Sequence, residues 1–594
     1  MPSPKRPRLA ALRSGGGKKW ILIGLTVIAV ILYAYSAWIS RYNLSNIDGV
    51  SYMSIARQYA EGLTSYALNA YWSPWVSWLM APLIAWGLTP VAAFMWVNFL
   101  ASSLATVLGT FYIWRRTDRR FIPALITFIS IFSLFIAQLP TITPDGWVVT
   151  WTILFGMLLT WLDDRLRPGS IRDRILGGVL IGATGVLGYL IKQYLIPVFF
   201  VTLIIWLIVR MVSDRKEAKQ LPLREKLKRW GILPGVALVT IILVAGPWVA
   251  ALSIKYGQPT IGTSFAVNIG QKFNPDGTSI VGGPLDLPAP PNKHAVAYGE
   301  DRGVAAAENG GTFQSNSTLF QRAKYYFDQR VSAFPYYLIK VQSLTVFGFL
   351  IVVSFFIALA FGWIHRKNHR DAVTIGILWM VYFAGYAAIT SVISGGGNAR
   401  YYWPLLPLGT MLFSLLLPNF WHSVAGKFGG WRKALAIVLI ALVPLTAIAE
   451  NALGRPFPFS NIRSSSGIGY FTIPPIAPAP YDLSNQIRAD GVIPKDARIV
   501  GTNYRMTVRV GYYLGDQVYG TSGHDYDISN PAFQSVLSKN GINYFITYTP
   551  VGSKSQNAGD YATIVKEYRQ DIACSDTKSP AVVPCKIRIW HISG

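Results

Sequence analysis

The sequence predicts a polytopic α-helical membrane protein of about eleven transmembrane helices that ends in an extracytoplasmic α/β domain. Of its 594 residues, 52% are hydrophobic and only 14% are charged. In soluble domains about a quarter of the residues are charged. Apolar stretches near the ~20 residues that span a bilayer recur over the first 450 positions. The 20 Trp, 31 Tyr and 30 Phe exclude a disordered chain, and two cysteines exclude a disulfide scaffold.

The chain divides into a basic N-terminus (1–19), a transmembrane module (20–450) and a C-terminal domain (451–594). The predicted spans are 20–40, 90–114, 121–139, 147–162, 175–191, 194–212, 231–252, 342–364, 371–393, 402–418 and 433–450. The first is too long for a signal peptide, and no small-residue cleavage site follows it before Arg41.

The charged loops predict the orientation. The formal net charge is +26, and about half of the basic residues lie in the N-terminus and in every second loop. These basic segments are 115–120, 165–174, 210–229, 366–370 and 427–433. Lys and Arg are enriched in cytoplasmic loops, so we expect a cytoplasmic N-terminus and an extracytoplasmic C-terminus in a bacterial plasma membrane. Nucleic-acid binding is the alternative explanation of the positive charge. It is disfavoured because the basic segments lie on one side of the predicted membrane.

Three regions then face outward: 42–89, the Gly- and Pro-rich loop 253–341, and the tail 451–594. In the tail, strand-like runs at 498–502, 517–520 and 543–548 alternate with helix-like stretches at 481–490 and 531–540. This alternation predicts a small α/β domain.

The only two cysteines, Cys574 and Cys585, lie in that tail. Outside the membrane we expect them to form a disulfide that closes a short loop. Two free thiols are the alternative, and a metal site lacks further ligands nearby.

The first outer region holds a short amphipathic helix. Tyr52, Ile55 and Tyr59 follow the i, i+3, i+7 spacing of one helix face, and Gly62 ends the pattern before it could span a membrane. We expect this helix to lie along the membrane surface. Asp48 would then sit at its start, either as a functional carboxylate or as a simple N-cap.

Aromatic residues follow this helix in the stretch Tyr71-Trp72-Ser73-Pro74-Trp75. Such clusters are commonly interfacial belts. Aromatic rings also stack on sugars, which makes Tyr52, Tyr71 and Trp72 candidates for sugar binding.

Further charges lie at the outer ends of predicted spans. Asp145 is the single acid of a short outer loop, where it could simply be solvated. Lys192 lies between two apolar spans. A charge there is costly, so we interpret it first as a functional residue. The alternative is that its side chain extends to the lipid headgroups. Arg400 and Tyr401 follow three glycines, a pattern that suits a phosphate but also a hinge.

These segments resemble the GT-C glycosyltransferases that use polyprenyl-phosphate sugars, in the branch of protein O-mannosyltransferases and the lipid A aminoarabinose transferase. The resemblance covers residues 20–450 and is carried in order by segments 48–56, 71–74, 188–192, 246–248 and 400–407. It implies that Asp48 is the catalytic base. Asp145 is the second candidate, because it is the other carboxylate on a short outer loop.

Two positions depart from the family. Gly49 stands where members often have a second acid, which argues against the divalent metal that the family leaves open as a cofactor. The aminoarabinose transferase also has a lysine in the segment before span two, assigned to the donor phosphate, where this chain has Ser73 or a neighbour. Lys192, Arg400 and Tyr401 would therefore bind the donor phosphate.

We therefore expect an integral membrane enzyme, surrounded by membrane lipids, that transfers a hexose or a pentose with inversion. Its donor is a polyprenyl-phosphate-linked sugar and its acceptor a lipid, a glycan or a protein, with no nucleic-acid partner. Two alternatives remain: a transporter or flippase of lipid-linked glycans, and a scaffold whose external domain binds glycans. Internal repeats and midplane charges, typical of transporters, are not evident in the sequence.

Overall fold

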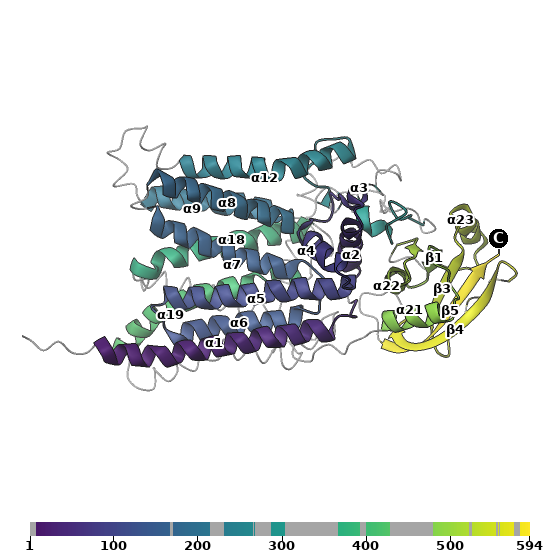
Figure 1. The fold of residues 1–594 in the computed structure, drawn as a ribbon, viewed down its shortest axis with the longest axis horizontal. Helices are drawn as coiled ribbons and strands as arrows, with labels where there is room; N and C mark the ends of the chain where they lie inside the picture. The colour runs from purple at the N-terminus through teal and green to yellow at the C-terminus, as the bar shows by residue number, and fades with distance from the viewer. Residues whose placement is uncertain are drawn as a thin grey trace, which may run out of the picture.

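A computed structural model describes residues 8–44, 46–166, 170–213, 231–264, 267, 287–302, 304, 366–392, 399–427, 479–521, 526–553, 556, 559–574 and 582–593. Long helices lie side by side in a bundle, and a small domain with a β-sheet lies at one end of it (Figure 1).

The bundle consists of long helices joined by short surface elements. The long helices are α1 (Arg8–Ile39), α5 (Pro90–Arg116), α6 (Phe121–Gln138), α7 (Asp145–Arg165), α8 (Ile171–Ile191), α9 (Leu195–Ser213), α12 (Ile232–Tyr256), α18 (Arg366–Val392) and α19 (Leu405–Lys427). The short elements are α2 (Ile47–Ala60), α3 (Thr64–Ala67), α4 (Trp75–Ala85) and the 3-10 turns η1 (Tyr298–Asp301) and η2 (Ala399–Tyr402).

Six of these helices, namely α1 from Gly17 onward, α5, α7, α8, α9 and α12, are long and apolar enough to cross a membrane. Helix α6 matches predicted span 121–139, and α18 and α19 match 371–393 and 402–418. The predicted spans 342–364 and 433–450 lie outside the described residues. The number of eleven therefore stays a prediction.

Apolar side chains cover the outside of the bundle. Leu243 and Ile242 on α12 are 69% and 59% exposed, and Trp86 is 79% exposed. Apolar surface of this extent is stable when lipid rather than water surrounds it. The chain is a polytopic helical membrane protein.

Small residues let two of these helices approach closely. A Cβ at Gly182 of α8 would lie 2.6 Å from the carbonyl oxygen of Ala237 on α12. In membranes, where no hydrophobic effect drives helices together, such close packing supplies much of their association energy.

The small domain is a mixed sheet covered by helices on both faces. Its elements are α21 (Ala479–Ala489), β1 (Arg498–Gly501), α22 (Tyr504–Leu514), β2 (Gln517–Val518), α23 (Pro531–Lys539), β3 (Tyr544–Pro550), β4 (Ala562–Ala573) and β5 (Val582–Ile592). The strand order is β2-β1-β3-β5-β4, with β2, β1 and β3 parallel and β5 and β4 antiparallel. Residues of α21 and α22 pack on one side, and Phe533 and Leu537 of α23 on the other.

A disulfide joins Cys574, just after β4, to Cys585 on β5, with Cα atoms 5.8 Å apart. Cys574 follows Ala573, the last paired residue of β4, whereas Cys585 lies within β5 and pairs with Gln570. The thiols are therefore not free in this structure.

The small domain packs directly on helix α2, most of whose residues are buried. Helix α22 packs on α2. The Tyr513 hydroxyl donates to the Tyr42 carbonyl oxygen at 3.0 Å, and the Tyr42 ring stacks on Tyr481 at 4.6 Å between centroids. The residues that precede α2 thus contact the domain directly.

Candidate active site

The first carboxylate of the site, Asp48, lies in the first turn of α2. Asn46 caps this helix, because its side-chain oxygen accepts a hydrogen bond from the Asp48 N–H at 3.0 Å. The interpretation of Asp48 as the N-cap is therefore wrong. Its side chain instead accepts a hydrogen bond from Arg400 Nη2 at 2.7 Å.

The second carboxylate, Asp145, is the first residue of α7 rather than a loop residue. Its Oδ1 lies 2.7 Å from Lys192 Nζ, and its Oδ2 lies 3.7 Å from Arg400 Nε. Asp145 is therefore not a solvated acid, and Lys192 is held by an ion pair within the protein. Residues from α2, α7, η2 and the end of α8 meet in this cluster.

The two carboxylates differ in access. The Asp145 side chain is 4% exposed, whereas that of Asp48 is 24% exposed. Burial would raise the pKa of Asp48, but Arg400 first, and then other cations, hold it below its ordinary value. Asp48 is thus a partly exposed carboxylate whose charged form the neighbouring cations favour, whereas Asp145 is buried.

Tyr401 lies against both cations. Lys192 Nζ is 4.7 Å and the Arg400 guanidinium carbon 5.3 Å from the centre of its ring. The Tyr401 ring also stacks on the ring of Tyr386 of α18, with 5.5 Å between their centroids. Tyr401 therefore orders the two cations through its ring face.

The three predicted sugar-stacking residues form one aromatic group. Trp72 meets Tyr52 edge-on at 5.0 Å and Tyr71 at 4.7 Å between centroids. Tyr52 is 3% and Tyr71 8% exposed, so Trp72 is the most open of the three. The group lies next to Asp48 because Tyr52 is one helical turn beyond it.

The structure adds a cation that sequence reasoning missed. Arg302 Nη1 donates a hydrogen bond to the Tyr71 hydroxyl at 3.2 Å, and its guanidinium lies 6.0 Å from the Trp72 ring centre. Burial would lower the pKa of Arg302, but neighbouring oxygens, that of Tyr71 first, raise it above its ordinary value. No periodicity or motif in the Gly- and Pro-rich loop marks this residue.

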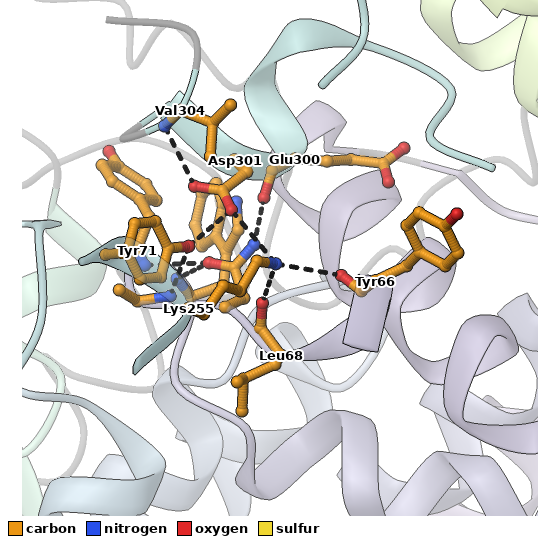
Figure 2. A network of polar contacts seen from close by, with 11 residues as sticks. Tyr66, Leu68, Tyr71, Lys255, Glu300, Asp301 and Val304 are labelled. Atoms are coloured by element: carbon orange, nitrogen blue, oxygen red, sulfur yellow. Dashed lines mark hydrogen bonds and ion pairs between the residues drawn. The ribbon is translucent and has the colours of Figure 1, made fainter. Parts of the chain in front are cut away.

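A polar network at the end of α12 anchors the segments that carry Tyr71 and Arg302. In Figure 2 the Lys255 ammonium lies between the Asp301 carboxylate, at 3.7 Å, and the carbonyl oxygens of Tyr66 and Leu68. The Tyr256 hydroxyl also donates to Asp301. One helix end therefore fixes both segments beside the cluster.

Glu300, next to Asp301, ties the same turn to its surroundings. Its carbonyl oxygen accepts from the Asn69 side chain, and its carboxylate accepts from the Val296 N–H. Burial raises the pKa of Glu300 to about 7. The turn is thus held on both sides by buried polar contacts.

Gly49, where the sequence departs from the glycosyltransferases that it resembles, is tightly packed. A Cβ at this position would lie 2.2 Å from Ile142 Cγ2 and 2.9 Å from the Ile142 carbonyl oxygen. No side chain fits there without movement. Both Asp48 and Asp145 are paired with cations, and among the described residues no three acidic, His or Cys side chains gather as metal ligands. These residues do not fit a divalent metal site.

Comparison with solved structures identifies the fold. The crystal structure of ArnT from Cupriavidus metallidurans bound to undecaprenyl phosphate matches with a TM-score of 0.53 and 12% identity, over 96% of this chain and 98% of that one. The chain has the fold of ArnT. The apo structure of the same protein gives 0.51 and 15% identity, over 90% and 94% of the two chains.

ArnT, the lipid A aminoarabinose transferase, is a GT-C protein, so the GT-C resemblance seen in the sequence is confirmed at the level of fold. An apo oligosaccharyltransferase from Archaeoglobus fulgidus is less similar, with a TM-score of 0.45 at 12% identity over 89% of this chain and 70% of that one. No protein-family model and no curated protein sequence matches the chain.

Proposed function

We propose that the chain is an integral membrane glycosyltransferase that takes a sugar from a polyprenyl-phosphate donor at the extracytoplasmic face. The observation that carries the proposal is the cluster itself: an open carboxylate, Asp48, beside Lys192 and Arg400 at one end of a bundle with the ArnT fold. A base beside phosphate-binding cations is what displacement of a lipid phosphate requires.

The reaction is a single displacement with inversion at the anomeric carbon. The acceptor oxygen attacks that carbon, its proton passes to Asp48, and the carbon–oxygen bond to the lipid phosphate breaks. Lys192 and Arg400 stabilise the departing phosphate. Asp145, buried behind them, positions both cations and takes no proton.

Charge balance supports this assignment. Arg302, Arg400 and Lys192 face Asp48 and Asp145, which leaves one positive charge for a singly charged phosphodiester. The departing phosphomonoester gains close to a second negative charge. Protonation of Asp48 removes one at the same step, so the site remains neutral throughout.

Arg400 couples phosphate binding to the strength of the base. In the free site it pairs with Asp48 at 2.7 Å and lowers the pKa of that carboxyl. When the donor phosphate draws Arg400 away, Asp48 loses this opposite charge and becomes a stronger base.

Removal of either cation should weaken donor binding. We expect Lys192→Ala and Arg400→Ala to lower the affinity for undecaprenyl phosphate by about 10- to 100-fold, the usual value of a charge-assisted contact. Equilibrium binding to the purified protein in nanodiscs measures this. Arg41→Ala is the control, because Arg41 contacts Trp38 and Tyr42 away from the cluster. Parent-like affinity in both variants would place the phosphate elsewhere and contradict the proposed function.

The orientation follows from the charged loops. The basic loop 115–120 connects α5 and α6, and α7 begins with Asp145 at the opposite end of the bundle, beside the small domain (Figure 1). The positive-inside rule puts that loop in the cytoplasm and the site outside. A lipid-linked donor and its acceptor would then meet on the outer face.

Labelling of introduced cysteines tests this orientation. In intact cells, a membrane-impermeant maleimide should label Lys539→Cys on the small domain and leave Arg115→Cys unlabelled until the membrane is permeabilised. Both positions are exposed, and the two native cysteines are in a disulfide and do not interfere. Labelling of both positions from the same side would contradict the proposed topology.

A further inference from the structure

A segment that precedes the small domain by about 200 residues in the sequence bridges the edge of its sheet. We call residues 287–302 the strap. Ala297 of the strap bridges Val518 in parallel, and the Val518 N–H donates to the Val296 carbonyl oxygen at 2.6 Å. Strand β2 is the edge of the sheet, and without the strap the Val518 N–H would lack a partner on that side. The strap therefore contacts the sheet edge through one β-bridge.

Side chains strengthen this contact. Gln517 Nε2 donates to the Asn292 carbonyl oxygen at 3.0 Å. The hydroxyls of Tyr298 and Thr521 are hydrogen bonded at 2.8 Å, and both residues are buried. The Tyr298 ring also contacts Tyr504 of α22 at 5.9 Å between centroids. The domain thus holds the strap up to the turn η1.

The same turn, η1, also contacts residues that lie next to Asp48. The Gly299 carbonyl oxygen accepts hydrogen bonds from Trp72 Nε1 at 2.8 Å and from the Ser51 hydroxyl at 3.2 Å. Arg302 follows three residues later and reaches Tyr71. Its charge also acts on Asp48, whose carboxylate it helps to keep ionised.

We propose that the small domain is a positioning part of the active site: by binding the strap at β2, it holds Arg302 beside Asp48 and Tyr71. The inference rests on the proposed function, since Arg302 is the third cation of the donor site. The domain then acts through the 298–302 turn. Thr521 and Tyr298 are positioning residues, and neither touches the reacting atoms.

Thr521→Val tests this coupling, because it keeps the shape of the side chain and removes the hydroxyl that Tyr298 contacts. We expect about three- to tenfold weaker binding of undecaprenyl phosphate, the effect of one buried hydrogen bond. Hydrogen exchange of the strap peptide 294–302 should become faster in the same variant. Thr563→Val, the same change on the opposite edge strand β4, should alter neither measurement.

The combination with Arg302→Ala distinguishes positioning from general destabilisation. If the strap acts through Arg302, Thr521→Val should have no further effect on affinity in the Arg302→Ala protein, whereas a loss that simply adds would overturn the inference. Unchanged affinity of Thr521→Val with faster strap exchange would also overturn it. Absence of undecaprenyl phosphate binding in the parent protein would instead reject the proposed function, while the exchange data would still report whether the domain holds the strap.

Discussion

Asp48→Asn should lower the rate of sugar transfer by at least 100-fold while donor affinity changes little. General-base catalysis contributes about 10²- to 10⁴-fold, and an amide cannot take the acceptor proton. The amide oxygen can still accept the hydrogen bond that Arg400 donates at 2.7 Å, so the phosphate-binding arginine keeps its place. Single-turnover transfer from a polyprenyl-phosphate sugar, with donor binding measured in parallel, separates the two effects.

Asp145→Asn is the matched comparison, because it makes the same change in the other carboxylate. Asp145 lies 2.7 Å from Lys192 and 3.7 Å from Arg400. Its loss should release both cations and weaken donor binding together with turnover. If Asp48→Asn remained fully active while Asp145→Asn lost only turnover, the two roles would be exchanged.

The site was predictable where membrane topology alone brings residues together. Asp48, Asp145, Lys192 and Arg400 lie far apart in the sequence, but each was placed at the outer end of a predicted span. Ends of spans on one side of a membrane share one layer, so charges there meet without any pairing of sequence neighbours. The structure brings all four within ion-pair distance of a partner.

Arg302 was not predictable by this reasoning. It lies in a long loop, and a sheet edge more than 200 residues further along the chain holds its turn in place. Such a contact leaves no periodic signal in the loop sequence. The helix Tyr504–Leu514 was also missed, although the sequence carries its end signals: the Asn503 side chain caps its first turn by accepting a hydrogen bond from the Met506 N–H, and Gly515 ends it in the left-handed conformation. Its aromatic and β-branched residues favour strands and obscured these signals.

The packing around position 49 explains why a glycine stands there. The residue before it is the proposed base, and the glycosyltransferases that the sequence resembles often have a second acid here. In this chain Ile142, just before α7, fills the space where that side chain would begin. In this chain the contact between α2 and the α6–α7 loop therefore leaves no space for a second acid at position 49.

Gly49→Ala should accordingly impair both folding and catalysis. Its Cβ would lie 2.2 Å from Ile142 Cγ2 and 2.9 Å from a backbone oxygen. Overpacking of this kind costs about 1–3 kcal/mol, and here α2 must move, which shifts Asp48 relative to Arg400. We expect a lower melting temperature in nanodiscs and a transfer rate reduced at least tenfold, since misplacement of a reacting group by about 1 Å costs ~100-fold.

Two further variants show whether Ile142 is the cause. Ile142→Ala in the Gly49→Ala protein removes the Cγ2 contact but leaves the contacts with the Cβ, at 2.7 Å, and with the backbone oxygen, at 2.9 Å. Stability and rate should therefore recover only in part. Gly24→Ala on α1 is the control, because nothing lies within 4 Å of its Cβ position and alanine favours a helix. If Gly49→Ala matched the parent in melting temperature and rate, α2 would not be fixed against Ile142. The position of the Asp48 side chain would then depend on its ion pair with Arg400 and not on the packing of α2.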